Sequence, residues 1–341
     1  MARLYNIRPQ RNDFCEMPPV LDHLLRFVPI FRRYLWGGRR LGTMLGKPIG
    51  PEDDYAESWE IVDHAADQSV VQAGPFAGRK LGELMKEHGA ELLGPRASHE
   101  HFPLLFKFLD CNRTLSVQVH PNDKQASRLD PPDLGKTEAW VVLHADPGSK
   151  IYAGLTPDAT PALIAAAINE NRIEDFLHAF DAKRGDCVFI PAGTVHALGA
   201  GLVIAEIQQA SDTTFRLFDW NRVDAAGNPR PLHIEQSLEV IDYATGPVSP
   251  QRPRALEPGR ERLVACDKFV LDRCTLSVPL SIGGDERLHL LAVIEGAVEA
   301  SGDPAKAPLA VGATAVLPAA AGAIELRPRG EAVVLDITLP G

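Results

Sequence analysis

The stretch Leu115–Asp123, which reads LSVQVHPND, decides the fold class, because its apolar and polar residues alternate. Successive side chains of a β-strand point to opposite faces, so this pattern predicts a strand with one apolar and one polar face. The polar face would carry Ser116, Gln118 and His120. Taken alone, the pattern is typical of an edge strand whose polar row faces water. A chemical role for these residues requires partners elsewhere in the chain.

Length and composition indicate a large globular protein. The chain has 341 residues, more than one hydrophobic core usually serves, so we expect two domains or one large domain with an appendage. The formal net charge is −10, and Lys and Arg form no cluster that could follow a nucleic-acid backbone, so we expect no nucleic-acid partner. A small anionic substrate remains compatible with this charge, since a local basic pocket can form in an acidic protein.

Cysteine usage and the N-terminus predict a cytoplasmic protein. The five cysteines are odd in number and form no CxxC motif, which indicates reduced thiols. The first residues carry several charges and no long apolar core, so we expect no signal peptide. The alanine-rich run 307–324 contains prolines and glycines that make it a poor membrane span, so we expect no membrane partner.

Most of the chain is expected to form short β-strands, each bounded by Gly, Pro, Asp or Asn. Six of these strands cover residues 114–120, 138–145, 150–155, 186–192, 202–209 and 214–220. Helical periodicity is confined to residues 81–93, 160–169, 172–180 and 234–243. The predicted fold class is therefore mainly β with inserted helices, with a β-sandwich or barrel at its core.

Beyond a segment rich in Pro, Arg and Gly at 246–263, which we interpret as a linker, the chain repeats itself. Three pairs of segments match in the same order: 114–120 with 275–281, 138–148 with 286–296, and 185–196 with 312–323. The alignment puts Pro279, Ser281 and Ala323 opposite Gln118, His120 and His196. The second copy keeps the apolar framework without these polar residues, so a chemical role is the better interpretation of them in the first copy.

Three expected strand regions of the first copy carry candidate metal ligands, which are Gln118, His120, Glu138 and His196. Two imidazoles, a carboxylate and an amide oxygen suit Zn²⁺, with Fe²⁺ or Mn²⁺ as alternatives. Each residue also has an ordinary interpretation. A single histidine near a strand end is usually a surface or hydrogen-bonded residue, and Glu138 could simply pair with Lys136.

The segment Ala205–Trp220 adds a further pair of reactive groups. Glu206 lies on a strand, and Arg216 follows the turn-forming cluster Ser-Asp-Thr at 211–213. A hairpin here would bring the carboxylate and the guanidinium toward one mouth. The alternative is a cross-strand ion pair without a chemical role.

Five stretches in one order resemble the type I mannose-6-phosphate isomerases, most closely their shorter bacterial form. They are AESWEIVDH (56–64), PLLFKFLDCNRTLSVQVHPND (103–123), GKTEAW (135–140), GDCVFIPAGTVHALGAGLVIAEIQQASDTTFRLFDW (185–220) and PRPLHIEQSLEVI (229–241). The resemblance implies a double-cupin fold with a catalytic N-terminal unit and a degenerate C-terminal one. We therefore expect an N-terminal extension at 1–27, formed by an added helix or a disordered leader, then a catalytic domain at 28–245, the linker at 246–263 and a second domain at 264–341.

The resemblance also implies an activity and a set of site residues. The family interconverts mannose 6-phosphate and fructose 6-phosphate through a cis-enediol, with one zinc ion per chain. Its metal ligands correspond to Gln118, His120, Glu138 and His196, although the short bacterial form often counts only the two histidines and the glutamate. Catalytic or substrate-binding roles fall on Ser116, Lys136, Arg216, Glu206 and His64, of which His64 would assist ring opening.

Several alternatives stay open at the level of sequence. Glu206 is our preferred base for proton transfer, with Lys136 and His64 as alternatives. A phosphate dianion needs a cationic mouth, for which Lys136, Arg216, Lys107 and Arg172 are candidates, and Lys107 could equally be structural. An iron dioxygenase and a non-catalytic sugar-binding cupin are the rival functions. The expected partner is a small sugar phosphate, and the chain could be a monomer or a homodimer.

Overall fold

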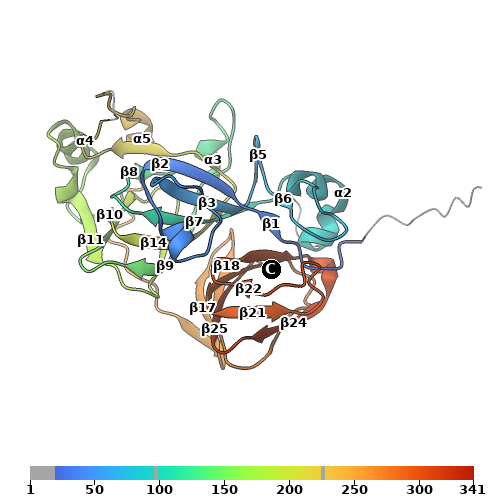
Figure 1. Ribbon diagram of the computed structural model, residues 1–341. Coiled ribbons are helices and arrows are strands. Elements are labelled where there is room, and N and C mark those ends of the chain that lie inside the picture. The colour runs from blue at the N-terminus through green and yellow to red at the C-terminus, as the bar shows by residue number, and fades with distance from the viewer. Residues whose placement is uncertain (1–19, 96–98, 224–226) are drawn as a thin grey trace, which may run out of the picture.

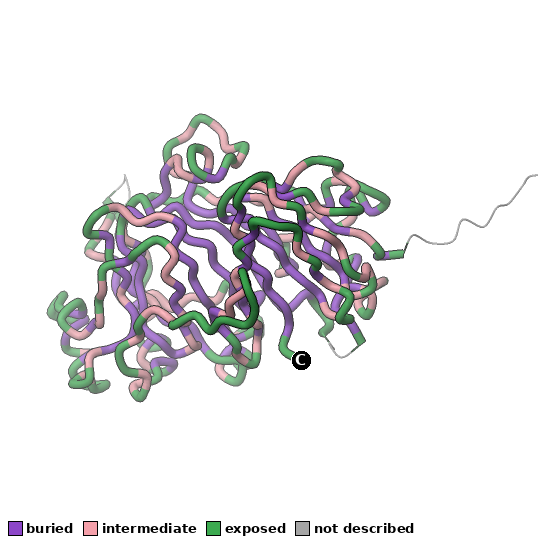
Figure 2. Tube along the Cα trace, turned by 90° about the horizontal axis from the view of Figure 1, so that it is seen from below, coloured by how far each residue is buried: buried purple, intermediate pink, exposed green. Residues whose placement is uncertain are grey.

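The computed structural model describes residues 20–95, 99–223 and 227–341, and it confirms the mainly β fold class. Figure 1 shows two β-sandwiches side by side, one built from the first two thirds of the chain and the other from the last third. Buried residues concentrate in the strands of both sandwiches, whereas the connecting loops are largely exposed (Figure 2). Within the described residues, no helix is long and apolar enough to cross a membrane.

The N-terminal sandwich consists of a six-stranded and a five-stranded antiparallel sheet. The first has the order β12 (Cys187–Ile190), β9 (Glu138–Ala145), β14 (Leu202–Gln209), β7 (Leu104–Cys111), β3 (Tyr55–Ile61), β2 (Ile30–Gly38). The second has the order β11 (Leu177–Asp181), β10 (Lys150–Leu155), β13 (His196–Leu198), β8 (Val117–Val119), β15 (Phe215–Phe218). Apolar side chains such as Trp140, Ile204, Ile151 and Leu198 fill the space between the sheets.

The C-terminal sandwich repeats this topology. Its larger sheet has the order β23 (Thr314–Leu317), β20 (His289–Glu295), β25 (Ala332–Thr338), β18 (Val270–Leu276), β17 (Arg260–Ala265), β16 (Arg254–Glu257). Its smaller sheet has the order β22 (Leu309–Ala310), β21 (Ala297–Ala300), β24 (Ala323–Pro328), β19 (Leu280–Gly283). Strand by strand, these orders correspond to those of the first sandwich, apart from β15, which has no counterpart here. The chain therefore contains two copies of one β-fold unit.

Strand register corrects the residue alignment between the copies. His196 pairs with Gln118, and its counterpart Ala323 pairs with Gly283, so Gly283 rather than Pro279 corresponds to Gln118. By the same comparison, Ile190 pairs with Glu138 and Leu317 pairs with His289. The position of Glu138 is thus occupied by His289 in the second copy, rather than by Glu286, which the sequence alignment put there.

Helices decorate the two sandwiches, largely as predicted. The helix α2 (Leu81–Leu93) packs near η2 (Ala319–Ala321) of the second sandwich, whereas α4 (Pro161–Asn169) and α5 (Ile234–Val240) cover the outer face of the five-stranded sheet. Thr160 caps α4, since its side chain accepts a hydrogen bond from Leu163 N at 3.3 Å. The helix expected at 172–180 is wrong, because only η1 (Ile173–Phe176) forms and the following residues pair with β10 as β11. The remaining elements are β1 (Phe27–Val28), α1 (Arg40–Thr43), β4 (Asp63–His64), β5 (Asp67–Gln68), β6 (Val70–Val71) and α3 (Asp123–Ala126).

The two six-stranded sheets pack against each other through the largest hydrophobic cluster, in which Val141 and Ala205 of the first meet Leu290 and Leu335 of the second. The N-terminal residues join the two units: Leu25 exchanges backbone hydrogen bonds with Val316. Of the expected extension at 1–27, residues 1–19 lie outside the described part, and the remainder forms no helix. The expected linker 246–263 contains β16 and the start of β17, so only residues 246–253 and the turn at 258–259 run without a strand or helix.

Candidate metal centre and active site

The polar side of β8 faces the interior of the N-terminal sandwich. This strand lies between β13 and β15, so it is not an edge strand, and the interpretation of a solvated polar row is wrong. Ser116 and His120 are buried and Gln118 is half-buried. Buried polar groups need partners, and those partners come from strands that are distant in the sequence.

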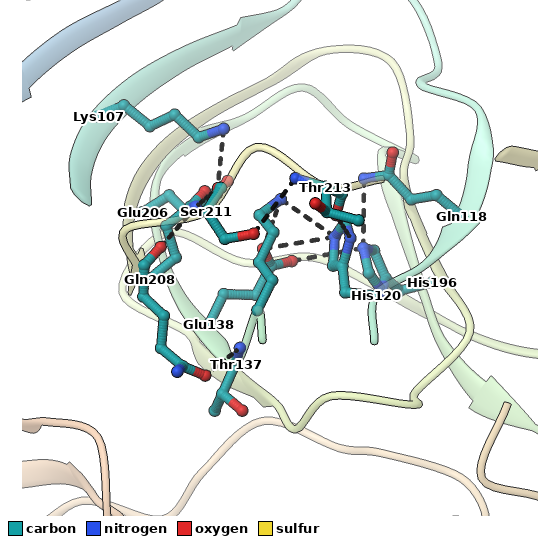
Figure 3. Close-up of polar contacts among 12 residues, drawn as sticks. Lys107, Gln118, His120, Thr137, Glu138, His196, Glu206, Gln208, Ser211 and Thr213 are labelled. Atoms are coloured by element: carbon teal, nitrogen blue, oxygen red, sulfur yellow. Dashed lines mark hydrogen bonds and ion pairs between the residues drawn. The ribbon is translucent and has the colours of Figure 1, made fainter. Parts of the chain in front are cut away.

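His120, Glu138 and His196 converge on one point, as the sequence predicted (Figure 3). One potential ligand atom of each residue lies within 4.8 Å of those of the other two, and all three residues are at most 1% exposed. His196 Nε2 lies 3.3 Å from Glu138 Oε1, and His120 Nε2 lies 3.6 Å from Glu138 Oε2. His120 follows the end of β8 and His196 begins the adjacent strand β13, whereas Glu138 begins β9 of the other sheet.

Backbone carbonyls fix the orientation of both imidazoles. His120 Nδ1 donates to Thr213 O at 3.0 Å, and His196 Nδ1 donates to Thr194 O at 2.9 Å. With Nδ1 protonated, each Nε2 carries a lone pair that faces the shared centre. Burial lowers the pKa of His120 well below its ordinary value and the pKa of His196 to about 4, so both rings are neutral near pH 7.

The donor set therefore fits a divalent metal ion. Two neutral imidazoles and one carboxylate form a common ligand set for zinc and for other first-row metals. Lys136 Nζ lies 3.1 Å from Glu138 Oε2 and 3.1 Å from His120 Nε2, so these acceptors already face a positive charge.

Gln118 lies beside the three donors. Its amide nitrogen is 3.2 Å from His196 Nε2, and its amide oxygen points away from the centre (Figure 3). Ligation through Oε1 would require the amide to turn by 180°, which exchanges the places of its oxygen and nitrogen. A role for Gln118 as a ligand stays a prediction.

A cavity of about 280 Å³ opens beside the metal centre. Its lining includes six residues that sequence analysis proposed: Lys107, Ser116, Gln118, Lys136, Glu206 and Arg216. It also includes five residues that sequence analysis missed: Tyr34, Trp36, Glu57, Asp212 and Arg230. Glu57 and Arg230 stand inside the motifs that carried the family resemblance, and the aromatic pair in YLWGG at 34–38 was a usable signal for a sugar-binding wall.

Lys107 joins two buried carboxylates on neighbouring strands. Its Nζ lies 3.3 Å from Glu206 Oε1 and 3.7 Å from Glu57 Oε2, and Trp59 Nε1 donates to Glu57 Oε2 at 2.5 Å. Burial raises the pKa of Glu206 to about 7, against the opposing effect of Lys107. For Lys107, burial would lower the pKa, but Glu206 and Glu57 outweigh it and hold the pKa above its ordinary value. Glu206 is therefore a carboxylate that can take up and release a proton near neutral pH.

Two arginines contribute positive charge to the lining of the cavity. Arg216 Nη1 donates to Pro231 O at 2.9 Å, and its buried Nε has no hydrogen-bond partner among the described residues. Arg230 is held by Asp219, with Nε 2.8 Å from Oδ2. Burial, together with the charge of Arg230, lowers the pKa of Arg216. A guanidinium with a free donor suits an anionic ligand.

Two sequence candidates lie elsewhere. Arg172 is exposed and pairs with Glu170 and Asp175, so its proposed place at the mouth is wrong. His64 does not line the cavity, and its Nε2 lies 3.1 Å from Asp133 Oδ1.

Comparisons with known proteins agree with this geometry. Residues 24–139 match the family model for the catalytic domain of type I phosphomannose isomerase. Mannose-6-phosphate isomerase ManA from Bacillus subtilis is 37% identical over 277 residues, which are 80% of this chain and 85% of that protein. Mannose-6-phosphate isomerase from Streptococcus mutans is 42% identical over 207 residues, or 61% of this chain and 64% of that protein.

Solved structures show the same fold. The crystal structure of mannose 6-phosphate isomerase from Bacillus subtilis has a TM-score of 0.85 and 29% identity, and the match covers 92% of this chain and 99% of that one. A mutant phosphomannose isomerase from Salmonella typhimurium, at a TM-score of 0.74 and 16% identity, supports the fold alone, with 94% of this chain and 100% of that one covered. From the identity and coverage of these relatives, together with the converging donor set, we conclude that the chain belongs to the type I phosphomannose isomerase family.

Proposed function

We propose that this chain interconverts mannose 6-phosphate and fructose 6-phosphate in the cavity above His120, Glu138 and His196. Membership of the mannose-6-phosphate isomerases supports the aldose–ketose reaction. The observation that carries the proposal is the meeting of these three buried donors, from separate segments, within 4.8 Å. Beside them lie a carboxylate with a near-neutral pKa and the free Nε donor of Arg216, groups suited to proton transfer on an anionic sugar.

We propose zinc as the metal, held by His120, Glu138 and His196, with Gln118 as an optional fourth ligand and one ion per chain. A bound divalent cation would polarise the substrate oxygens and stabilise negative charge in the enediolate. The Nδ1 hydrogen bonds to Thr213 O and Thr194 O hold both imidazoles ready for this role.

Glu206 is the proposed base. The isomerisation moves one proton between adjacent carbons, so the same group must take the proton from one carbon and return it to the other. A carboxylate with a pKa of about 7 is suited to both steps at neutral pH. Lys136, whose ammonium contacts Glu138, remains the alternative, whereas His64 lies outside the cavity lining.

The phosphate is proposed to bind at the arginine side of the cavity. Arg216 has an unused Nε, Arg230 adds positive charge, and Ser116 offers a hydroxyl. Arginine recognises phosphate through paired N–H donors, which favours this side over the single ammonium of Lys107. No observation favours the iron dioxygenase or the non-catalytic sugar-binding cupin.

We also propose a cytoplasmic location. The described cysteines Cys111, Cys187, Cys266 and Cys274 are all free, as expected for a reducing compartment.

A coupled assay tests the proposed function. Purified protein is supplied with mannose 6-phosphate, and fructose 6-phosphate is followed through a coupling enzyme, before and after treatment with a chelator. Activity that disappears with the chelator and returns with Zn²⁺ supports the proposal. Sugar phosphate binding without turnover under all metal conditions would instead identify a binding protein.

A further inference from the structure

We propose that Asp133 is a positioning residue of the metal centre, and that its carboxylate fixes the loop whose Thr213 carbonyl orients His120. The inference rests on the proposed function, because it concerns the same metal-binding histidine. Neither Asp133 nor Thr213 lines the cavity, so any effect on the site must act through other residues.

Asp133 gathers hydrogen bonds from three separate parts of the chain. Its Oδ2 accepts from Ser211 Oγ at 2.8 Å and from Thr213 Oγ1 at 2.6 Å. Its Oδ1 accepts from its neighbour Leu134 N at 2.8 Å and faces His64 Nε2 at 3.1 Å. The loop between α3 and β9, the loop between β14 and β15, and the strand β4 are therefore joined at a single carboxylate.

The connection continues from Thr213 to the metal centre. Ser211 Oγ accepts from Thr213 N at 3.2 Å, so the hydroxyl groups that bind Asp133 also set the backbone conformation of this loop. The carbonyl of Thr213 then accepts the Nδ1 proton of His120 at 3.0 Å. This contact decides which ring nitrogen carries the proton and directs Nε2 toward Glu138. A loop released from Asp133 would leave the imidazole free to rotate or to change tautomer.

An ionised carboxylate is required at position 133. Burial opposes the charge, but hydrogen bonds from His64, Thr213 and Ser211 outweigh it and hold the pKa of Asp133 far below its ordinary value. A carboxylate accepts at both oxygens, whereas the amide of asparagine has one accepting oxygen and one donating nitrogen. In an Asp133→Asn variant the amide NH₂ would replace one of the two accepting oxygens. It would then face donors, which are either the hydroxyl groups of Ser211 and Thr213 or Leu134 N–H and His64.

The same geometry gives His64 a role different from ring opening. Its side chain is anchored to Asp133, and the carboxylate raises the pKa of His64 against the effect of burial. As a member of this network, His64 helps to hold Asp133 in place. As a ring-opening catalyst, it would contact the substrate and leave metal affinity untouched, so metal binding separates the two roles.

The experiment measures metal affinity directly. Wild-type protein and Asp133→Asn are stripped of metal, and the dissociation constants for Zn²⁺ and Co²⁺ are determined by competition with a chromogenic chelator. Residues that orient metal ligands typically contribute 10–100-fold to affinity, so we expect Asp133→Asn to bind about 10–100-fold more weakly, with an altered visible spectrum of bound Co²⁺. His64→Ala is expected to shift affinity in the same direction by a smaller factor.

The matched control is Asp336→Asn in the second sandwich. Asp336 is buried, whereas Asp133 is half-buried, and like Asp133 it accepts at both oxygens, from His289 and Arg260. The described contacts provide no path from Asp336 to His120. We expect this variant to lower the thermal midpoint of the metal-free protein and to leave the Zn²⁺ dissociation constant unchanged. Affinity lost equally in both variants would show a general loss of stability and would overturn the proposal.

A second variant covers the case in which Asp133→Asn does not fold. Thr213→Val removes only the hydroxyl that binds Asp133 and keeps the backbone carbonyl, and Thr213→Ser restores the hydroxyl. We expect several-fold weaker metal binding in the valine variant and recovery in the serine variant. A wild-type Zn²⁺ dissociation constant in Asp133→Asn or Thr213→Val would overturn this inference and leave the proposed function standing. A wild-type protein that binds no metal would overturn the proposed function.

Discussion

The pH dependence of catalysis is the sharpest consequence of the buried Glu206. Burial raises the pKa of this carboxyl to about 7, and a base must be ionised to accept a proton. Below this pKa the ionised fraction falls, so kcat/KM of the free enzyme should show an acid limb near neutral pH. The change we propose is Glu206→Gln, which keeps the shape of the side chain and removes the titration.

The size of the effect follows from the pKa. With a value of about 7, roughly one carboxyl in eleven is ionised at pH 6 and roughly ten in eleven at pH 8. The wild-type kcat/KM should therefore fall about tenfold between pH 8 and pH 6. Loss of a general base typically costs about 10²–10⁴-fold in rate, which sets the expected deficit of Glu206→Gln at pH 8.

Replacing Lys107 provides a second test, because this lysine affects the pKa of Glu206 and therefore the acid limb of the pH profile. Its Nζ lies 3.3 Å from Glu206 Oε1 and stabilises the ionised carboxylate. At an effective dielectric constant of about 20, Coulomb's law gives at most about 5 kcal/mol for this separation, which corresponds to about 3–4 pH units. We expect Lys107→Met to move the acid limb upward by at least about one pH unit.

The assay is the coupled measurement of kcat/KM from pH 5.5 to 9, with the coupling enzyme in excess at every pH. Glu174→Gln serves as the control, because this exposed carboxylate binds Tyr152 on the surface and does not line the cavity. An acid limb that persists unchanged in Glu206→Gln would refute the assignment of the base and would direct attention to Lys136.

Three further predictions follow from other contacts. His120→Ala and His196→Ala should each lose bound metal and turnover, measured by elemental analysis and the coupled assay, while circular dichroism remains that of the wild type; retained metal in either would contradict the centre. Arg216→Met should raise KM for mannose 6-phosphate at least tenfold, with little change for an unphosphorylated sugar; equal effects on both sugars would exclude a phosphate contact. Burial lowers the pKa of His289, but Asp336 and Asp285 outweigh burial and raise this pKa above its ordinary value. The stability that protonated His289 contributes is therefore complete below about pH 6.5 and is lost as pH rises through the folded-state pKa. Urea unfolding from pH 5.5 to 9 should therefore show the advantage of wild type over His289→Gln shrinking as pH rises; a pH-independent difference would refute this.

Local sequence patterns were sufficient for much of the fold. The ends of β9, β10 and β14 were predicted to the residue, because long apolar or alternating runs bounded by turn residues leave little choice of element. The segment after Arg172 failed, since Ile173, Leu177 and Phe180 fit helical spacing equally well. Pairing of that segment with β10 prevailed over local periodicity, which is information that no short window contains.

The site shows the same limit. Three short segments supplied His120, Glu138 and His196 as candidate ligands, and the family resemblance implied that they share one metal. The burial of β8 was not predicted, because its partner β13 lies 78 positions further along the chain at the Gln118–His196 pair. Arg230 was missed for a related reason. Arg230 stands inside the motif at 229–241, but its place beside Arg216 depends on the path of the chain after β15, which that motif alone does not give.

The second sandwich shows in physical terms why one copy of the fold can hold a metal and the other is not expected to. Register puts His289 at the position of Glu138 and Asp336 at that of Glu206. In the second sandwich these charged groups pair with one another. Asp336 accepts from His289 Nδ1 at 2.8 Å and from Arg260 at 2.6 Å, and His289 Nε2 lies 3.0 Å from Asp285 Oδ1. Both nitrogens of that imidazole are therefore bound to carboxylates, and no lone pair is left to meet a cation. In the first sandwich each histidine donates Nδ1 to a backbone carbonyl, and its Nε2 lone pair faces the shared centre, where Lys136 and Gln118 contact it. The two copies therefore differ in which imidazole lone pairs remain available to a cation, since polar residues occupy equivalent positions in both.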